Sequence, residues 1–239
     1  MMFQKVIVVV DEGHPVKDLN SLLDALDSKV NIPDDLVILE GMVADTLAHA
    51  APWENIHSKL IIDATSAIAG DPIGPVEKTT VSSSLAVSSS AIEGVVQARM
   101  LRPSMMVITT SIEGGPIPEE SMENPDERLA EFQRERISSI RESIWALEAS
   151  QGLRWLLITD SDADLDSEDW QRRLLWQLFC RFDVGRDLHF DHSRTRVAWD
   201  ATVPIPSIEG PIPVRRWPAV TLHDPELVRK VDSWLSQRL

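Results

Sequence analysis

Apolar residues along the chain follow two kinds of pattern. Continuous runs rich in β-branched residues, such as KVIVVV at residues 5–10, are typical of buried strands. Apolar residues spaced three and four positions apart, as at residues 19–26, are typical of amphipathic helices. The first pattern predicts strands at residues 5–10, 36–39, 59–63, 93–101, 104–112, 154–159, 187–190 and 196–200, and the second predicts helices at about residues 19–30, 126–150, 168–182 and from 225 onward. This alternation predicts an α/β fold with mixed sheets.

A segment rich in Gly, Pro, Ser and Thr interrupts the pattern at residues 66–91. Such composition is typical of a linker, although its alternating valines and leucines could also form an edge strand. We therefore expect a first unit at residues 1–78, a Ser/Thr-rich connection at residues 79–91, and a second, fuller unit at residues 92–239.

The two units contain versions of one sequence pattern. Each has a strand that ends in Asp, a helix with paired leucines, a second strand after Asp-Leu, and a third strand that ends in Asp-Ala-Thr, as KLIIDAT at 59–65 and RVAWDAT at 196–202. The aligned pairs are Asp11 with Asp160, Lys29 with Arg181, and Asp35 with Asp187. Internal repetition outranks a single motif, so we expect a duplication about a pseudo-twofold axis. The alternative is that two β-α-β units resemble each other by composition.

These motifs also resemble a known family. The stretch LLITDSDADLDSEDWQRRLLWQLFCRFDVGRDLHF, the RVAWDAT strand and EGVVQARMLRPSMMVITTSI are similar to the C-terminal domain of UbiD-type decarboxylases, which are prenylated-flavin-dependent enzymes. Residues 92–239 resemble a full copy of that domain, and residues 4–75 resemble a partial copy.

The resemblance implies assembly rather than catalysis. In that family the flavin, the metal ions and the catalytic Glu-Arg-Glu set lie in other domains, and nothing in this sequence resembles those regions. RERISSIRE at residues 134–142 has the right residue types but does not match the catalytic motif. We therefore expect no catalytic, cofactor-binding or metal-binding residue here, and a prenylated flavin only on a partner subunit.

Composition narrows the functional classes further. A net charge of −15 opposes binding to nucleic acid or to an anionic membrane. The single cysteine excludes an internal disulfide framework and fits a reducing compartment. The apolar run near the start is too short for a signal-peptide core or a membrane span. We expect an acidic cytoplasmic protein that forms a homo-oligomer or pairs with a separate decarboxylase subunit.

The most acidic stretch of the chain is TDSDADLDSEDW, residues 159–170. An EF-hand loop would need Gly at its sixth position and Glu at its twelfth, and here these are Leu165 and Gln171. A looser cation site remains an alternative, because crowded carboxylates repel one another. The simplest interpretation is a helix entrance, with Asp166 or Ser167 as the cap and Glu168 and Asp169 in the first turn.

Two further groups could carry chemistry. Asp63 and Asp200 lie at strand ends, where α/β sheets often place ligands, but Asp before Ala-Thr can also fix a turn through backbone N–H groups. His189 and His192 could bind a metal with Asp191, but their spacing on a strand and its exit directs them to opposite faces.

We therefore expect a non-catalytic, UbiD-related assembly or accessory protein. The alternative is a stand-alone carboxy-lyase-like enzyme or small-ligand-binding protein with a site between the two units. An activity of the chain on its own is the less favoured prediction, since a shared fold does not transfer an activity.

Overall fold

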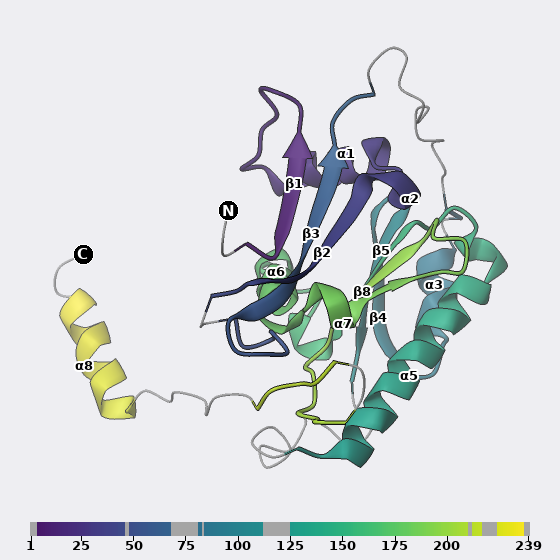
Figure 1. The fold of residues 1–239 in the computed structure, drawn as a ribbon. Helices are drawn as coiled ribbons and strands as arrows, with labels where there is room; N and C mark the ends of the chain where they lie inside the picture. Colours follow the sequence, from purple (N-terminus) through teal and green to yellow (C-terminus); the bar gives the residue numbers. More distant parts are fainter. Residues whose placement is uncertain are drawn as a thin grey trace.

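The computed structural model describes residues 4–45, 48–67, 81–82, 84–111, 125–209, 212–216 and 224–236. The chain forms a three-stranded sheet and a five-stranded sheet with helices around them (Figure 1). This confirms the predicted α/β class with mixed sheets.

The first unit holds the three-stranded sheet, in the order β1-β3-β2. It consists of β1 (Val6–Val10), α1 (Leu19–Lys29), α2 (Ile32–Asp35), β2 (Leu36–Val43) and β3 (Ile56–Ala64). Asp18 caps α1, because its carboxylate accepts hydrogen bonds from the backbone N–H groups of Asn20 and Ser21. Both strands are longer than the predicted strands at 36–39 and 59–63, since β2 extends to Val43 and β3 begins at Ile56.

The connection between the units contains a helix. α3 spans Leu85–Ser90, so the edge strand considered for this segment is wrong where the structure describes it. Leu85 is fully buried, which shows why the segment folds back as a helix and packs against the second unit. Residues 68–80, the remainder of the predicted Gly/Pro-rich stretch, lie outside the described residues.

The second unit holds the five-stranded sheet, in the order β4-β5-β6-β8-β7. Its strands are β4 (Val95–Arg102), β5 (Met105–Thr110), β6 (Trp155–Asp160), β7 (Leu188–Phe190) and β8 (Val197–Ala201), and its helices are α5 (Glu127–Ala146), α6 (Trp170–Arg181) and α7 (Val184–Asp187). Short 3₁₀ turns η1 (Glu148–Ser150) and η2 (Ser161–Ala163) precede and follow β6. All six residues of β5 are buried, as a central strand with both faces covered requires.

The strands β1–β3 and β6–β8 have the same arrangement. β1 runs parallel to β3, which pairs antiparallel with β2; β6 runs parallel to β8, which pairs antiparallel with β7. The short helix before β2 is closed by a 2.6 Å bond from Asn31 N–H to Asp35, and the one before β7 by a 2.7 Å bond from Asp183 N–H to Asp187. The two sets of elements therefore share topology and local hydrogen bonds.

One apolar core joins the two units. It combines the inner faces of both sheets with α1 and α6, and its buried members include Leu60 and Ile62 from the first unit and Trp155, Phe182 and Trp199 from the second. The Phe182 and Trp199 rings stack with centroids 5.0 Å apart. Because these side chains cover one another across the boundary, each unit depends on the other for burial.

Reciprocal hydrogen bonds reinforce this contact. Lys5, just before β1, donates to the carbonyl oxygens of Phe179 and Phe182 at the end of α6, at 2.8 and 3.0 Å. Arg154, just before β6, donates to the carbonyl oxygens of Asp27 and Val30 at the end of α1. We call this set of bonds the cross-unit clamp. Each cation lies where the exposed carbonyls and dipole of a helix end favour positive charge.

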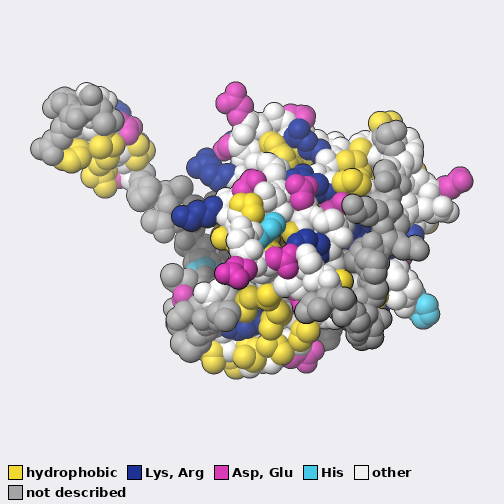
Figure 2. All heavy atoms as spheres, turned by 90° about the horizontal axis from the view of Figure 1, so that it is seen from above, with side chains coloured by type: hydrophobic (Ala, Val, Ile, Leu, Met, Phe, Trp, Pro, Cys, Tyr) yellow, Lys and Arg dark blue, Asp and Glu magenta, His cyan; other side chains and the backbone are white. Residues whose placement is uncertain are grey.

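The two sheets differ in their outer faces. α5 and α3 cover the outer face of the five-stranded sheet, and Ile137, Ile140 and Ile144 of α5 pack there. On the outer face of the three-stranded sheet, Val9 and Val37 are 43% and 49% exposed. The last helix, α8 (Pro225–Ser236), has no buried residue and stands clear of the body (Figures 1 and 2).

Candidate functional site

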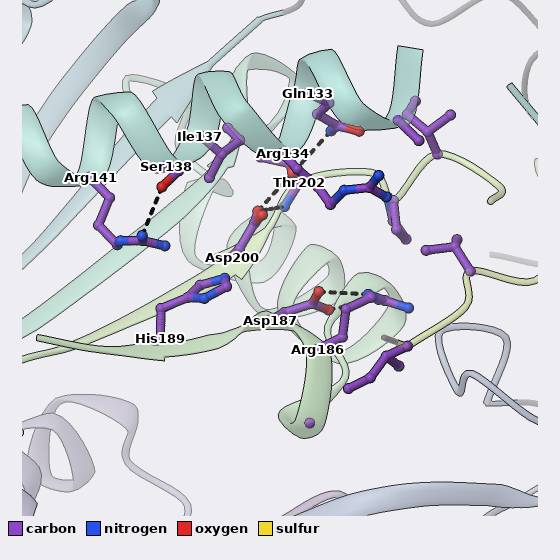
Figure 3. A pocket seen from close by; sticks show the side chains of 16 residues that line it. Gln133, Arg134, Ile137, Ser138, Arg141, Arg186, Asp187, His189, Asp200 and Thr202 are labelled. Carbon is purple, nitrogen blue, oxygen red and sulfur yellow. Dashed lines mark hydrogen bonds and ion pairs between the residues drawn. The ribbon is translucent and has the colours of Figure 1, made fainter. Parts of the chain in front are cut away.

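The best-defined hollow in the described part of the chain is a cavity of about 400 Å³ in the second unit (Figure 3). α5 forms one wall, α7 and the ends of β7 and β8 form another, and the segment after β8 closes one end. Its lining combines charged and polar groups with apolar side chains from α5 and with Pro204, Ile205, Ile212 and Val214. This volume lies within the usual range for small-molecule pockets.

α5 supplies the basic wall because of its helical period. Arg134, Ser138 and Arg141 are four and three residues apart, so they share one face with the buried Ile137. Arg141 donates to Ser138 at 2.9 Å and to Glu142 at 3.0 Å. Ile137 packs against the sheet, so it fixes how close the arginines come to β7 and β8.

The segment after β8 is tied to α5. Gln133 donates to the Val203 carbonyl at 2.9 Å, and Asp126 N–H donates to the Pro206 carbonyl at 3.1 Å. Glu127 accepts bonds from the Ser207 hydroxyl and the Ile208 N–H. These bonds hold the apolar end of the cavity in place.

Asp200 and His189 lie on the sheet side of the cavity, facing Arg141 (Figure 3). Burial raises the pKa of Asp200, although its carboxylate accepts two bonds from Thr202. Burial and the nearby Arg141 lower the pKa of His189 to about 4, so the imidazole is neutral at pH 7. Next to them Arg186 and Asp187 form an ion pair at 2.6 and 2.7 Å, which leaves this pair little net charge.

The Asp-Ala-Thr strand ends form turns, as one of the two interpretations predicted. Asp63 accepts bonds from the backbone N–H and hydroxyl of Thr65, at 2.9 and 2.8 Å. Asp200 makes the same two bonds with Thr202, at 3.0 and 2.7 Å. Asp63 is exposed, whereas Asp200 also faces the cavity, so the two copies of this turn have different surroundings.

The acidic stretch is largely occupied by protein partners. Asp160 and Asp162 both pair with Arg181, at 2.8 and 3.0 Å, while Asp166 accepts from Gln97 and Asp169 pairs with two arginines of α6. Burial raises the pKa of Asp160 to about 6, against the opposing effect of Arg181. Among the residues with described positions, no group of three or more His, Cys, Asp or Glu side chains is placed to hold a metal ion.

The predicted cap of α6 is wrong. The helix begins at Trp170, after Asp169, and the side chain of Asp169 makes no capping hydrogen bond. That carboxylate instead bonds Arg172 and Arg173 one turn further on. The carboxylate at the start of α6 thus pairs with two guanidinium groups and does not cap the backbone N–H groups of the helix.

Sequence reasoning missed the cavity but contained part of its signal. His189 was singled out together with His192, but only His189 lines the cavity. RERISSIRE was set aside because it does not match a catalytic motif, yet it supplies Arg134 and Arg141. Their seven-residue spacing already placed both arginines on one helix face.

No helix within the described ranges is long and apolar enough to cross a membrane.

Comparison with known proteins gives a family match for the first unit. Residues 1–64 match the family of the 3-octaprenyl-4-hydroxybenzoate carboxy-lyase C-terminal domain, UbiD_C. A phenolic acid decarboxylase of Streptomyces sp. (strain D7) is 38% identical over 68 residues, which are 28% of this chain and 14% of that protein. The matched part is therefore a small fraction of the relative's length.

Two solved structures are also similar to parts of the chain. The UbiD-class enzyme HmfF of Pelotomaculum thermopropionicum, solved with FMN, is 20% identical, with a TM-score of 0.27, over 32% of this chain and 18% of its own. Vanillic acid decarboxylase of Sedimentibacter hydroxybenzoicus, in its open form, is 14% identical, with a TM-score of 0.38, over 74% of this chain and 37% of its own. The resemblance to UbiD-type C-terminal domains predicted from the sequence is confirmed by this match, which covers residues 1–64 of the 239 residues of the chain.

Proposed function

We propose that this chain is a non-catalytic assembly or accessory protein of a UbiD-type decarboxylase, and that the flavin site lies on a separate subunit. The family match supports this role, because it falls on a C-terminal domain. The uncovered α8 carries the proposal most directly. We also infer that the two units descend from one duplicated unit, in view of their shared topology and hydrogen bonds.

α8 has the form of a docking helix. Leu227, Val228, Val231, Trp234 and Leu235 make one apolar face, and all five are at least 42% exposed. An isolated helix of about twelve residues is only marginally stable in water, so burial of this face would stabilise α8. Figure 2 shows the hydrophobic side chains gathered on one side of the helix.

The outer face of the three-stranded sheet is a second surface suited to assembly. α5 covers the corresponding face of the five-stranded sheet, but Val9 and Val37 stay open to solvent. Exposed apolar surface of this kind often marks a protein interaction site. A chain that offers both a docking helix and an open sheet face is suited to joining subunits.

The assembly role is tested by native mass spectrometry of the tagged chain isolated from its own cells, beside the recombinant chain. We expect a larger subunit at fixed stoichiometry, with flavin absorbance only in the complex. Val231→Glu should release that subunit. Ser233→Glu adds the same charge on the opposite face of α8 and should retain it. Isolation of the chain alone from its cells, without a larger subunit, would contradict the accessory role.

The cavity favours a second candidate function, a small-ligand-binding protein. The sequence suggested a site between the two units, whereas the cavity lies in the second unit, with Gly185 at its edge next to Ser58 of the first. A binding role of this kind is compatible with assembly, because no residue of α8 lines the cavity.

A further inference from the structure

We propose that the cavity between α5 and the ends of β7 and β8 binds a small organic monocarboxylate, with its charged end at Arg141 and its apolar body against Ile205, Ile212 and Val214. This site is separate from the apolar surfaces assigned to assembly. Failure of one proposal therefore leaves the other intact.

The charges of the lining favour an anion of charge −1. Three arginines and two aspartates line the cavity, and Arg186 and Asp187 neutralise each other. Arg134, Arg141 and Asp200 remain, and these leave an excess of one positive charge. Glu142 also bonds Arg141; its side chain is 62% exposed and that of Arg134 is exposed as well, so water screens both charges. A phosphate dianion would meet Asp200 without enough positive charge to balance it.

Hydrogen-bond donors are available for a carboxylate. The Nη1 of Arg141 makes no hydrogen bond with any residue that the structure describes, and neither does the Arg134 guanidinium. Arg186 differs, because its donors are committed to Asp187, the Ala50 carbonyl and the Arg181 carbonyl. A carboxylate accepts well from a guanidinium, whose fork of donors matches its two oxygens.

The other end of the cavity suits an apolar group. Ile137 and Ile205 are buried, and Pro204, Ile212 and Val214 continue this surface. Figure 3 shows Arg141, His189 and Asp200 together, with Arg134 and Gln133 further along α5. Arg141 thus lies at one end of the cavity and the apolar side chains of the segment after β8 lie towards the other, so the cavity matches a short acid with a hydrocarbon body.

Isothermal titration calorimetry on the full chain tests this site with three probes: cyclohexanecarboxylate, the uncharged cyclohexanecarboxamide, and inorganic phosphate. We expect the carboxylate to bind at one site, and the amide and phosphate to bind at least about tenfold more weakly, since a hydrogen bond to a charged group contributes about 1.5–3 kcal/mol. Absence of carboxylate binding at millimolar concentration would overturn the proposal. Equal binding of the amide or of phosphate would do the same.

Substitutions in α5 locate the site. Arg141→Gln should weaken carboxylate binding about tenfold or more, Arg141→Lys should restore part of it, and Arg134→Gln should have a smaller effect in the same direction. Arg128→Gln, on the same helix but outside the lining, is the matched control and should bind as the unmodified chain does. Far-ultraviolet circular dichroism confirms that each variant is folded. If Arg141→Gln and Arg134→Gln are folded and both keep full affinity, the carboxylate does not occupy this cavity.

Discussion

Arg181 is the cationic partner of two aspartates in the acidic stretch at residues 159–170. It is only 8% exposed and pairs with both Asp160 and Asp162, two of the carboxylates that suggested a cation loop. Lys29 pairs with Asp11 at the equivalent place in the first unit. In both units, the positive charge next to the aspartates thus comes from a basic side chain about twenty residues further along the same chain.

Arg181→Met should destabilise the protein by about 3–5 kcal/mol, because it leaves the largely buried carboxylate of Asp160 without its charged partner. The free energy of unfolding in urea measures this effect. Arg172→Met is the control, since Arg172 is 83% exposed and its loss should cost less than about 1 kcal/mol. A similar cost for both variants would show that the buried pairing contributes little.

His189 should make stability depend on pH. Its pKa is about 4 in the folded chain and about 6.5 when unfolded, so the unfolded state binds more protons between these values. The folded state should therefore lose stability as pH falls from 6.5 towards 4, by about 1 kcal/mol at pH 5 after allowance for partial exposure. Neighbouring Arg141 adds to the lowering of this pKa, while Asp187 and Glu142 oppose it.

His189→Asn should remove this component of the pH dependence. Urea unfolding is measured at pH 7 and pH 5 for the variant and for the unmodified chain. The change in unfolding free energy between the two pH values is then compared, so that contributions common to both chains cancel. His192→Asn substitutes an exposed histidine just after β7 and should leave the change in unfolding free energy between pH 7 and pH 5 as it is in the unmodified chain. Equal pH dependence of His189→Asn and the unmodified chain would contradict the assignment.

At the scale of elements, the cross-unit clamp joins the start of one strand to the end of a helix in the other unit. Lys5 holds the end of α6 and Arg154 holds the end of α1. In both contacts a basic side chain that precedes a strand donates to carbonyl groups at the end of a helix in the other unit. The clamp thus ties the two units together at two separate places.

Lys5→Met and Arg154→Met should each lower the free energy of unfolding by about 1–3 kcal/mol, because helix-end carbonyls lose a charged donor. Thermal and urea denaturation measure this loss. Lys17→Met removes an exposed lysine from the loop before α1 and should cost less than about 0.5 kcal/mol. Equal stability of the Lys5, Arg154 and Lys17 variants would show that the clamp does not hold the units together.

Local patterns in the sequence predicted most elements well. The β-branched run at residues 5–10 and the helix capped by Asp18 lie where the pattern placed them, because both depend on neighbouring residues. The cavity could not be predicted in this way. It depends on the segment at residues 204–209 folding against α5, through contacts such as Ser207 with Glu127, which are 80 positions apart. Such a contact has no local sequence signal.

At the scale of the whole molecule, the shared core predicts that both units unfold together. Leu60→Ala in the first unit should lower stability by about 2–5 kcal/mol, since Leu60 is fully buried among residues of both units. Circular dichroism and tryptophan fluorescence should report one coincident transition. Leu227→Ala on α8 is the control and should leave that transition unchanged. Two separate transitions would show that the units are independent.

The shared core also limits which surfaces of the first unit are open to another copy of the chain. The inner face of the unit that contains the matched residues 1–64 is already covered by the second unit, through Trp155, Phe182 and Trp199. A free unit of the same kind cannot take that place without displacing the second unit of this chain. Differently tagged copies of the chain, once mixed, should therefore show no exchange of single units between them.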